Sequence, residues 1–479
     1  MAAKKLILTY VDSLRTDMLE EAIAAGRAPN FGALVERGTL IPDCVSSFPS
    51  VTPVACAEMV TGVAADRHWI SGMNWYHRLE RRYVEYGSSL EATRTVGVFR
   101  ALYDLVYNMN LAHLNPAVET LFERLDDAGV RTASTPFLIY RGRHRHQVSL
   151  EGLLRRAVET TRLKFRHHTW GPAELFYGDL YASRDVPCKP SSIPGARDAY
   201  SACCAAELVR DGGFDFLLFS LPDNDNYSHR HGPAASVESI ARADACFGEL
   251  AEAGGGLEEL LAEHAVILLA DHAHTPVERG LPLAEILGRD WTVLAPSDDR
   301  PELAQLAVSP TSRAAHVYLL PGEGERADRD EVRRRLAGIE GVDLVCRREG
   351  ESAVVERGGE QLRFRPGSDV KDLRGTRWNF DGDVATLPAV EYPDAFARVF
   401  SAVSAPQAGD FVLSLTPGYE AVDWGGISHA GGGSHGSLHA EDSLGPLLFV
   451  GCGPDDPAAR RQWALRDVAP TVLNHFGIG

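Results

Sequence analysis

Three apolar runs of strand length constrain the fold of this chain most, because polar residues follow each run at once. The runs cover residues 6–11, 214–221 and 266–270. Continuous apolar runs without alternation are typical of strands buried on both faces of a parallel sheet. A chain of 479 residues with 44% hydrophobic content can bury such a core. The sequence therefore predicts an α/β fold with a mostly parallel sheet sandwiched by helices.

Side chains of metal-ligand type follow these runs and one glycine-rich segment near the C-terminus. They are Asp12, then Asp225 and His229, then Asp271 and His272, and finally His435. The carboxyl ends of strands in an open α/β sheet border one crevice, so residues distant in sequence converge there. Three carboxylates and three imidazoles are enough for two adjacent divalent ions. Mixed Asp and His ligands favour zinc first and manganese second.

A hydroxyl in the segment SSFPSVTPVACAEMVTG is a candidate nucleophile. Thr52 precedes Pro53, which predicts an N-cap threonine with proline at the first helical position. The hydroxyl would then lie at the positive end of a helix, where it can bind or attack a phosphate. A purely capping role is the alternative interpretation. A neighbouring metal site favours the nucleophile, because a metal-bound hydroxyl loses its proton more readily.

The order of these motifs resembles the alkaline phosphatase superfamily. Asp12 comes first, Thr52 stands nine residues before Thr61 of VTG, and then follow D-x-x-x-H-x-x-G-P, DH and G-S-H-G. The chain is most similar to the type I phosphodiesterase and nucleotide pyrophosphatase branch, with phosphonoacetate hydrolase as a relative. The resemblance implies hydrolysis of phosphodiester or nucleotide pyrophosphate bonds through a phospho-threonine intermediate.

The resemblance also implies which residues hold the two metals. One ion would be bound by Asp225, His229 and His435. The other would be bound by Asp12, Asp271 and His272, with the Thr52 oxygen at or between the two metals. For the first ion Asp223 is an alternative ligand, because Pro222-Asp223 resembles the P-D of nucleotide pyrophosphatases. Asp225 is preferred because it stands four residues before His229.

One departure from the family pattern concerns the phosphate-binding amide. Relatives carry an Asn three residues after the nucleophile, and here that position is Ala55. Asn74 or Asn226 could take over this role. The alternatives are a phosphonoacetate-type phosphonate hydrolase, a phosphomonoesterase, and a catalytically impaired, metal-stabilised binding protein.

Changes in the pattern of apolar, charged and turn residues along the chain predict its domain organisation. A phosphohydrolase core is expected over residues 1–289 and 401–479, with insertions at about 76–114 and 141–190. Residues 290–400 combine strand-like runs, a charged helix and a probable hairpin at Gly358-Gly359, which predicts an inserted α+β cap over the metal site. The basic segment 141–166 is either a phosphate-attracting rim or a solvated amphipathic helix.

The composition limits the classes of binding partner and the cellular compartment that can be expected. The net charge of −18 disfavours a nucleic-acid duplex or an anionic membrane as a partner and leaves a small phosphorylated or phosphonate substrate. The first core strand begins too early for a removable leader, and no run approaches the ~20 apolar residues of a membrane span. These features predict a cytoplasmic protein. The eight cysteines predict no metal or disulfide framework, with Cys203 and Cys204 buried and reduced.

Overall fold

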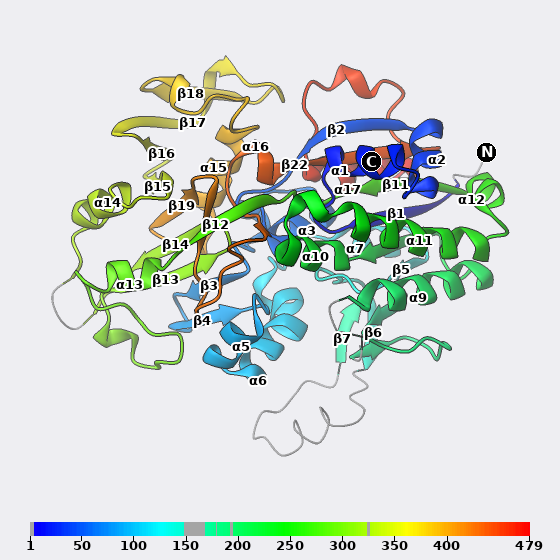
Figure 1. Cartoon of the computed structure of the whole chain (residues 1–479), viewed down its shortest axis with the longest axis horizontal. Helices are drawn as coiled ribbons and strands as arrows, with labels where there is room; N and C mark the ends of the chain where they lie inside the picture. The colour runs from blue at the N-terminus through cyan, green and yellow to red at the C-terminus, as the bar shows by residue number, and fades with distance from the viewer. Residues whose placement is uncertain (1–3, 148–167, 179, 192–194, 323–325) are drawn as a thin grey trace.

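A sheet of eight strands lies at the centre of the larger of two structural units (Figure 1). The computed structural model describes residues 4–147, 168–178, 180–191, 195–322 and 326–479. In spatial order the strands are β2 (Thr39–Val45), β22 (Leu444–Val450), β11 (His264–Leu269), β1 (Lys5–Val11), β10 (Phe216–Leu221), β5 (Thr132–Ser134), β8 (Glu174–Tyr177) and β9 (Tyr181–Ala182). The strands from β11 to β8 run parallel, and the antiparallel pairings lie at the two edges. The predicted α/β class with a mostly parallel sheet is confirmed.

Helices cover both faces of this sheet, which explains why its central strands are apolar throughout. Leu6 and Leu8 of β1 pack in one cluster with α3 (Thr52–Thr61), α7 (Leu121–Asp127) and α17 (Val468–His475). Ile7 and Val11 point to the opposite face, because side chains alternate along a strand. There they pack with α1 (Thr16–Ala24), α2 (Pro29–Arg37), α9 (Arg197–Asp211), α11 (Val237–Ala253) and α12 (Leu257–Glu263). The metal-ligand candidates therefore follow strands that are fixed from both sides.

A second sheet of seven antiparallel strands lies beside the first, at the left of Figure 1. Its order is β13 (Leu306–Thr311), β14 (Ala314–Leu319), β19 (Phe411–Leu415), β15 (Val342–Glu349), β16 (Ser352–Arg357), β17 (Glu360–Lys371) and β18 (Arg377–Asp381). Gly358 and Gly359 have positive φ values of 57° and 89° and form the turn of the β16–β17 hairpin. The sheet includes β19, which lies beyond the predicted segment 290–400. The placement of a cap over the metal site stays a prediction.

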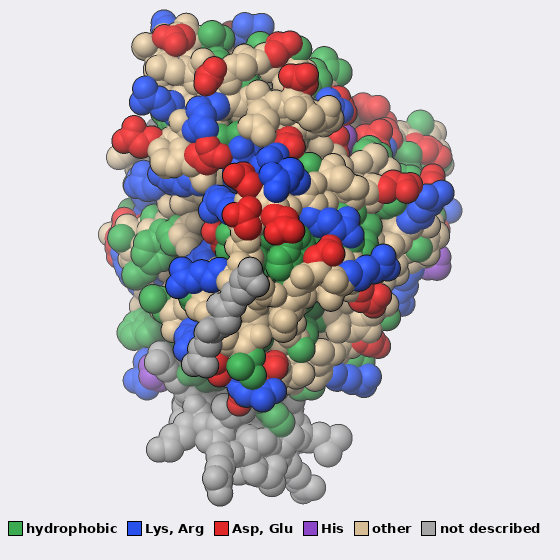
Figure 2. All heavy atoms as spheres, turned by 90° about the vertical axis from the view of Figure 1, so that its left-hand side faces the viewer, with side chains coloured by type: hydrophobic (Ala, Val, Ile, Leu, Met, Phe, Trp, Pro, Cys, Tyr) green, Lys and Arg blue, Asp and Glu red, His purple; other side chains and the backbone are tan. Residues whose placement is uncertain are grey.

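Helices and charges complete this second unit. The helices are α13 (Leu283–Leu287), α14 (Arg329–Ala337) and α15 (Ala395–Ser404). Figure 2 shows the face at this end of the molecule, where acidic and basic side chains are interspersed. Arg335 pairs with Asp290 at 2.9 Å and Arg333 with Glu356 at 2.6 Å, which agrees with such a mixture.

A small three-stranded sheet connects the two units. It consists of β20 (Gly418–Ala421), β12 (Thr275–Leu281) and β21 (Gly433–Ser434). The antiparallel register of β12 and β21 pairs Thr275 with Ser434 and Pro276 with Gly433. The chain segments just before β12 and just after β21 are thereby brought side by side.

Short elements of residues 74–113, together with one further strand pair, extend the molecule below the main sheet in Figure 1. They are β3 (Asn74–His77), β4 (Arg82–Glu85), α5 (Leu90–Val96), α6 (Val98–Tyr103), a π-helix (Asp104–His113) and the pair β6 (His144–Gln147) with β7 (His168–Gly171). At the start of the basic segment, Arg141 pairs with Glu123 and Arg143 with Asp127. These arginines are neutralised by α7. The remainder of that segment, residues 148–167, lies outside the described residues.

The expectation of reduced cysteines is wrong for Cys203, which forms a disulfide with Cys188. Cys188 lies in the loop before α9, so the pairing depends on the path of that loop and not on a recognisable spacing. Cys204 is free and buried. Within the described residues, no helix has both the length and the apolar character needed to cross a membrane.

Candidate active site

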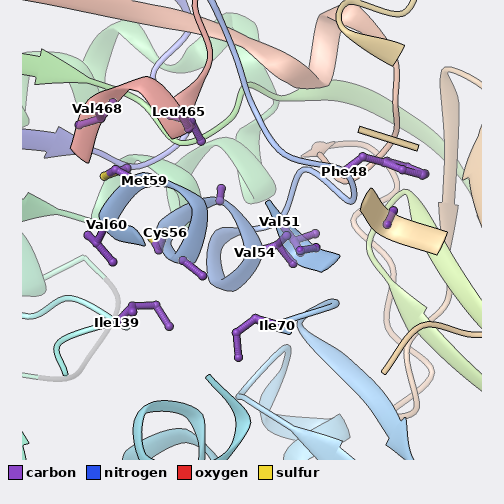
Figure 3. Packing of buried hydrophobic residues seen from close by; sticks show 14 of the residues in the cluster. Phe48, Val51, Val54, Cys56, Met59, Val60, Ile70, Ile139, Leu465 and Val468 are labelled. Carbon is purple, nitrogen blue, oxygen red and sulfur yellow. The ribbon is translucent and has the colours of Figure 1, made fainter. Parts of the chain in front are cut away.

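Helix α3 holds Thr52 at its first position. The helix is buried from Pro53 to Val60, and Figure 3 shows it among Ile70, Ile139, Leu465 and Val468. The N-cap is Val51, one residue earlier than predicted, so Thr52 is the first helical residue and not the cap. Instead, Thr52 Oγ1 lies 3.3 Å from His272 Nε2. The hydroxyl is therefore directed to the candidate metal ligands.

Asp12, Asp271 and His272 form one cluster beyond the ends of β1 and β11. Their potential ligand atoms lie within 4.8 Å of one another, and all three residues are buried. His272 Nε2 is 3.2 Å from Asp271 Oδ2 and 3.7 Å from Asp12 Oδ1. Two carboxylates and one imidazole form a donor set suited to a divalent ion.

A second cluster contains Asp225, His229, His274 and His435, again with ligand atoms within 4.8 Å of one another. Asp225 and His229 are four residues apart on α10 (Asp223–His231), which places them on one face of the helix. Asp225 Oδ1 is 3.4 Å from His229 Nε2 and 3.7 Å from His435 Nε2. Sequence reasoning missed His274, whose Nε2 is 2.9 Å from the same oxygen.

The two clusters adjoin each other. The rings of His272 and His435 are stacked with centroids 3.8 Å apart. Ser13, which sequence reasoning also missed, donates a hydrogen bond from Oγ to Asp225 Oδ1 at 2.8 Å and one from its backbone N–H to Asp271 Oδ1 at 3.2 Å. The arrangement therefore provides two neighbouring donor sets with a hydroxyl at their edge.

Three of the imidazoles are oriented by backbone carbonyls. The Nδ1 atoms of His229, His272 and His435 lie 2.8, 3.3 and 2.8 Å from the oxygens of Gly433, Ala273 and Ser50. An N–H donated at Nδ1 leaves the lone pair of Nε2 directed into the cluster, as is usual for histidine ligands. Burial lowers the pKa of each of these histidines to about 4, so they are neutral at neutral pH.

The carboxylates of Asp12 and Asp271 are buried close together, so their negative charges repel each other and a bound cation would reduce that repulsion. Burial, followed by the charge of Asp271, raises the pKa of Asp12. Burial also raises the pKa of Asp271 to about 6. Asp271 Oδ2 is buried and has no hydrogen-bond partner among the described residues. A carboxylate oxygen of this kind needs a positive partner, so the donor sets fit divalent metal ions.

The two aspartates on α10 have different surroundings. Asp225 lies in the cluster, whereas Asp223 binds Arg197 at 3.0 Å and accepts hydrogen bonds from the backbone N–H groups of Gly195 and Asp198. The geometry therefore favours Asp225 over Asp223 as a candidate ligand.

Neither candidate amide, Asn74 or Asn226, has a hydrogen bond to a cluster residue among the described residues. Asn74 is fully buried in β3, and neither atom of its amide has a partner among the described residues. Asn226 lines a cavity of about 430 Å³ between α9, α10 and α11. Their roles in substrate binding stay predictions.

A further histidine lies against the clusters without belonging to them. His429 stacks on His229 with ring centroids 4.0 Å apart, and its Nδ1 lies 2.8 Å from Glu420 Oε1. Glu420 is buried. Sequence reasoning gave no signal for this residue, because its neighbourhood depends on β20 and the loop before β21.

Comparisons with known proteins identify the family and similar folds. The family model for type I phosphodiesterase / nucleotide pyrophosphatase matches residues 6–438. Two crystal structures of phosphonoacetate hydrolase from Sinorhizobium meliloti 1021, in complex with phosphonoformate and with phosphonoacetate, are similar in fold. Each covers 99% of this chain and 96% of its own, with a TM-score of 0.60 and identities of 18% and 17%. No curated protein matches in sequence. The resemblance predicted from the motifs is confirmed: the chain belongs to the type I phosphodiesterase and nucleotide pyrophosphatase family.

Proposed function

We propose that this phosphoester hydrolase cleaves phosphodiester or nucleotide pyrophosphate bonds with Thr52 as the nucleophile and two bound divalent ions. The observation that carries the proposal is the position of Thr52 Oγ1, 3.3 Å from His272 Nε2 at the junction of the two donor clusters. Thr52 is the first residue of its helix and not the N-cap, which is Val51. In the proposed mechanism, its hydroxyl attacks a bound phosphoryl group.

The proposed ligand sets follow the clusters. Asp225, His229 and His435 would hold one ion, and Asp12, Asp271 and His272 the other, with the Thr52 oxygen beside them. Zinc fits the mixed nitrogen and oxygen donors best, and manganese is the second choice. When bound, such a pair of ions polarises phosphoryl oxygens and favours loss of the proton from a neighbouring hydroxyl.

In the first step, Thr52 Oγ1 releases its proton to water and attacks phosphorus. An oxygen–phosphorus bond forms to Thr52, and the bond to the leaving alcohol or nucleotide breaks with its electron pair on the leaving oxygen. The N-terminus of α3 would lie beside the phosphoryl group and favour its negative charge. In the second step, the oxygen of a water molecule bonds to phosphorus, and the bond from phosphorus to Thr52 Oγ1 breaks with its electron pair on Oγ1. A proton from that water restores the hydroxyl, and the phosphoryl product leaves.

A phosphonate hydrolase is a second candidate. The two similar crystal structures contain phosphonoformate and phosphonoacetate, and the same donor clusters and hydroxyl suit cleavage of a carbon–phosphorus bond. Relatives carry a phosphate-binding Asn where this chain has Ala55. The missing amide argues against a substrate-binding site closely similar to that of the nucleotide pyrophosphatases. The buried amide of Asn74, unpartnered among the described residues, is a candidate substitute donor. Phosphomonoester hydrolysis and metal-stabilised binding without turnover are the remaining alternatives.

A substrate panel and one substitution series test the proposal. Zinc- and manganese-loaded protein would be assayed on bis-p-nitrophenyl phosphate, p-nitrophenyl phosphate, dinucleotides and phosphonoacetate. Thr52→Ala should lower kcat by several orders of magnitude with unchanged metal content, because it removes the attacking atom and no proposed side-chain ligand. Thr52→Ser should keep part of the activity.

Thr61→Ala is the matched control, because Thr61 ends the same helix and its hydroxyl bonds only within that region. It should leave kcat near the wild-type value. Near wild-type turnover by Thr52→Ala would show that water attacks directly. Two bound ions without turnover of any substrate in the panel would favour the binding-protein alternative.

A further inference from the structure

We infer that His274 is a fourth side-chain ligand of the first metal ion, in addition to Asp225, His229 and His435. The inference rests on the proposed two-metal site and extends it to a residue outside the ligand pattern implied by the family resemblance. His274 follows His272 by two residues, in the segment that leads directly into β12. Their rings are nearly parallel, with centroids 5.9 Å apart.

The backbone register explains why His274 reaches the first cluster. Thr275 pairs with Ser434 in the antiparallel β12–β21 ladder. His274 and His435 are therefore the next two residues opposite each other, and their ring centroids are 5.0 Å apart. The strand pairing that positions the predicted ligand His435 positions His274 as well.

The distances around Asp225 are those of a coordination shell. Its Oδ1 atom is 2.9 Å from His274 Nε2, 3.4 Å from His229 Nε2 and 3.7 Å from His435 Nε2. Donor atoms bound to one zinc at about 2.1 Å lie on the order of 3–3.5 Å apart. The His229 distance falls within this range, and the His274 and His435 distances lie within about 0.2 Å of it, so all three nitrogens are close to the spacing of donors that share one ion.

A purely orienting role for His274 explains less. Asp225 Oδ1 already accepts a hydrogen bond from Ser13 Oγ at 2.8 Å. His274 is fully buried, and its Nδ1 atom has no hydrogen-bond partner among the described residues. That nitrogen lies against Gly433, where a Cβ atom would be only 3.1 Å away. Unlike His229, His272 and His435, His274 therefore has no backbone carbonyl at Nδ1 among the described residues, and the inference rests on the position of its Nε2 atom beside Asp225 and the other two imidazole nitrogens.

The consequence is an asymmetric pair of sites. The first site offers three imidazoles and one carboxylate, whereas the second offers two carboxylates, one imidazole and the neighbouring Thr52 hydroxyl. Imidazole-rich sets favour zinc over manganese, and oxygen-rich sets accept manganese more readily. The first site should therefore bind zinc more tightly and fill first.

Zinc titration of the metal-free protein against a chromophoric chelator tests the inference. Wild-type protein should bind two ions, and His274→Ala should weaken the first site by more than about 100-fold, beyond the 10–100-fold usual for outer-shell partners. His274→Gln keeps an N–H near the Nε2 position but is a poor zinc ligand, so it should behave like His274→Ala. His429→Ala is the control, because His429 stacks on His229 while its ring nitrogens lie outside the cluster.

X-ray absorption of wild-type protein with one equivalent of zinc provides a measurement that needs no variant. It should count three imidazole nitrogens around the ion. A count of two or fewer, an unchanged affinity in His274→Ala, or restoration by His274→Gln to within tenfold of wild type would each overturn the inference. If wild-type protein binds no metal at all, the proposed function fails. If it binds two ions and only the His274 results disagree, this inference alone fails.

Discussion

Ser13 Oγ donates a hydrogen bond to Asp225 Oδ1 across 2.8 Å, which connects the end of β1 to the first turn of α10. Ser13 has a positive φ of 60°, a backbone conformation that residues with a side chain adopt rarely and that is often found at functional sites. This conformation also lets its backbone N–H reach Asp271 Oδ1. One residue therefore orients a carboxylate of each cluster.

Removal of the Ser13 hydroxyl should loosen the first site. Ser13→Ala is expected to weaken metal binding or activity by about 10–100-fold, as for other groups that orient metal ligands. Ser13→Gly loses the same hydroxyl but relieves the positive φ, so it should have a similar effect on metal affinity with a higher melting temperature than Ser13→Ala. Chelator competition and thermal unfolding measure the two effects. Wild-type affinity in both variants would exclude this orienting role.

Substitution of the two aspartates on α10 should give different results. Asp225→Asn should abolish activity and release about one ion per chain, as measured by elemental mass spectrometry, because Asp225 lies in the donor cluster. Asp223→Asn should have a milder effect, because Asp223 contacts Arg197 and the backbone before α9. The reverse ranking would transfer the ligand role to Asp223.

A buried carboxyl in α9 predicts a pH dependence of stability. Burial, followed by the charge of Asp223, raises the pKa of Asp198 to about 8, whereas an unfolded aspartate titrates near about 3.9. Between these values the folded state keeps a proton that the unfolded state releases, so the free energy of unfolding falls as pH rises. The limiting slope is about 1.4 kcal/mol per pH unit.

Asp198→Asn removes this titration and keeps an oxygen for the N–H of Asp223, which now bonds Asp198 Oδ1 at 2.9 Å. The variant should therefore gain stability over wild type as pH rises from 5 to 8. Urea unfolding at both pH values measures the gain. A constant difference between the two proteins would contradict the raised pKa.

The disulfide between Cys188 and Cys203 closes a loop over a sequence separation of 15 residues. A loop of this size corresponds to about 3 kcal/mol of stabilisation in the chain-entropy model. Cys203→Ser should lower the free energy of unfolding by up to this amount in oxidised protein and make stability insensitive to a reducing agent. Cys204→Ser, at a buried free thiol, should leave that sensitivity intact. Equal responses to reductant would show that the bond does not form.

Much of the central sheet could be predicted because its strands are buried on both faces. The run 6–11 lies within β1 (Lys5–Val11), and the run 214–221 contains β10 (Phe216–Leu221). The start of α3 was displaced by one residue, because Val51 and not Thr52 has the extended backbone of the N-cap. Local patterns define such elements well and their ends less well.

Five of the six predicted ligands converge because their motifs follow the neighbouring strands β1, β10 and β11, whereas His435 follows β21 of the small sheet. Their binding roles remain proposals. His274 could not be found in the same way. A histidine two residues after another carries little signal, and its approach to His435 depends on a pairing between residues 275 and 434 that no local pattern encodes. The Cys188–Cys203 bond was missed for a similar reason, because spacing alone does not define the path of a loop.

The pairing of β12 with β21 has a consequence for how this protein can diversify. The chain enters the small three-stranded sheet immediately after His274 and leaves it immediately before His435, with Thr275 and Ser434 paired in one ladder. The long intervening stretch is thus a loop whose two ends meet. Insertions, deletions or exchanged segments within it can alter the surroundings of a substrate while the two histidines keep their separation. Recombination at this junction offers a route to new specificities on an unchanged chemical centre.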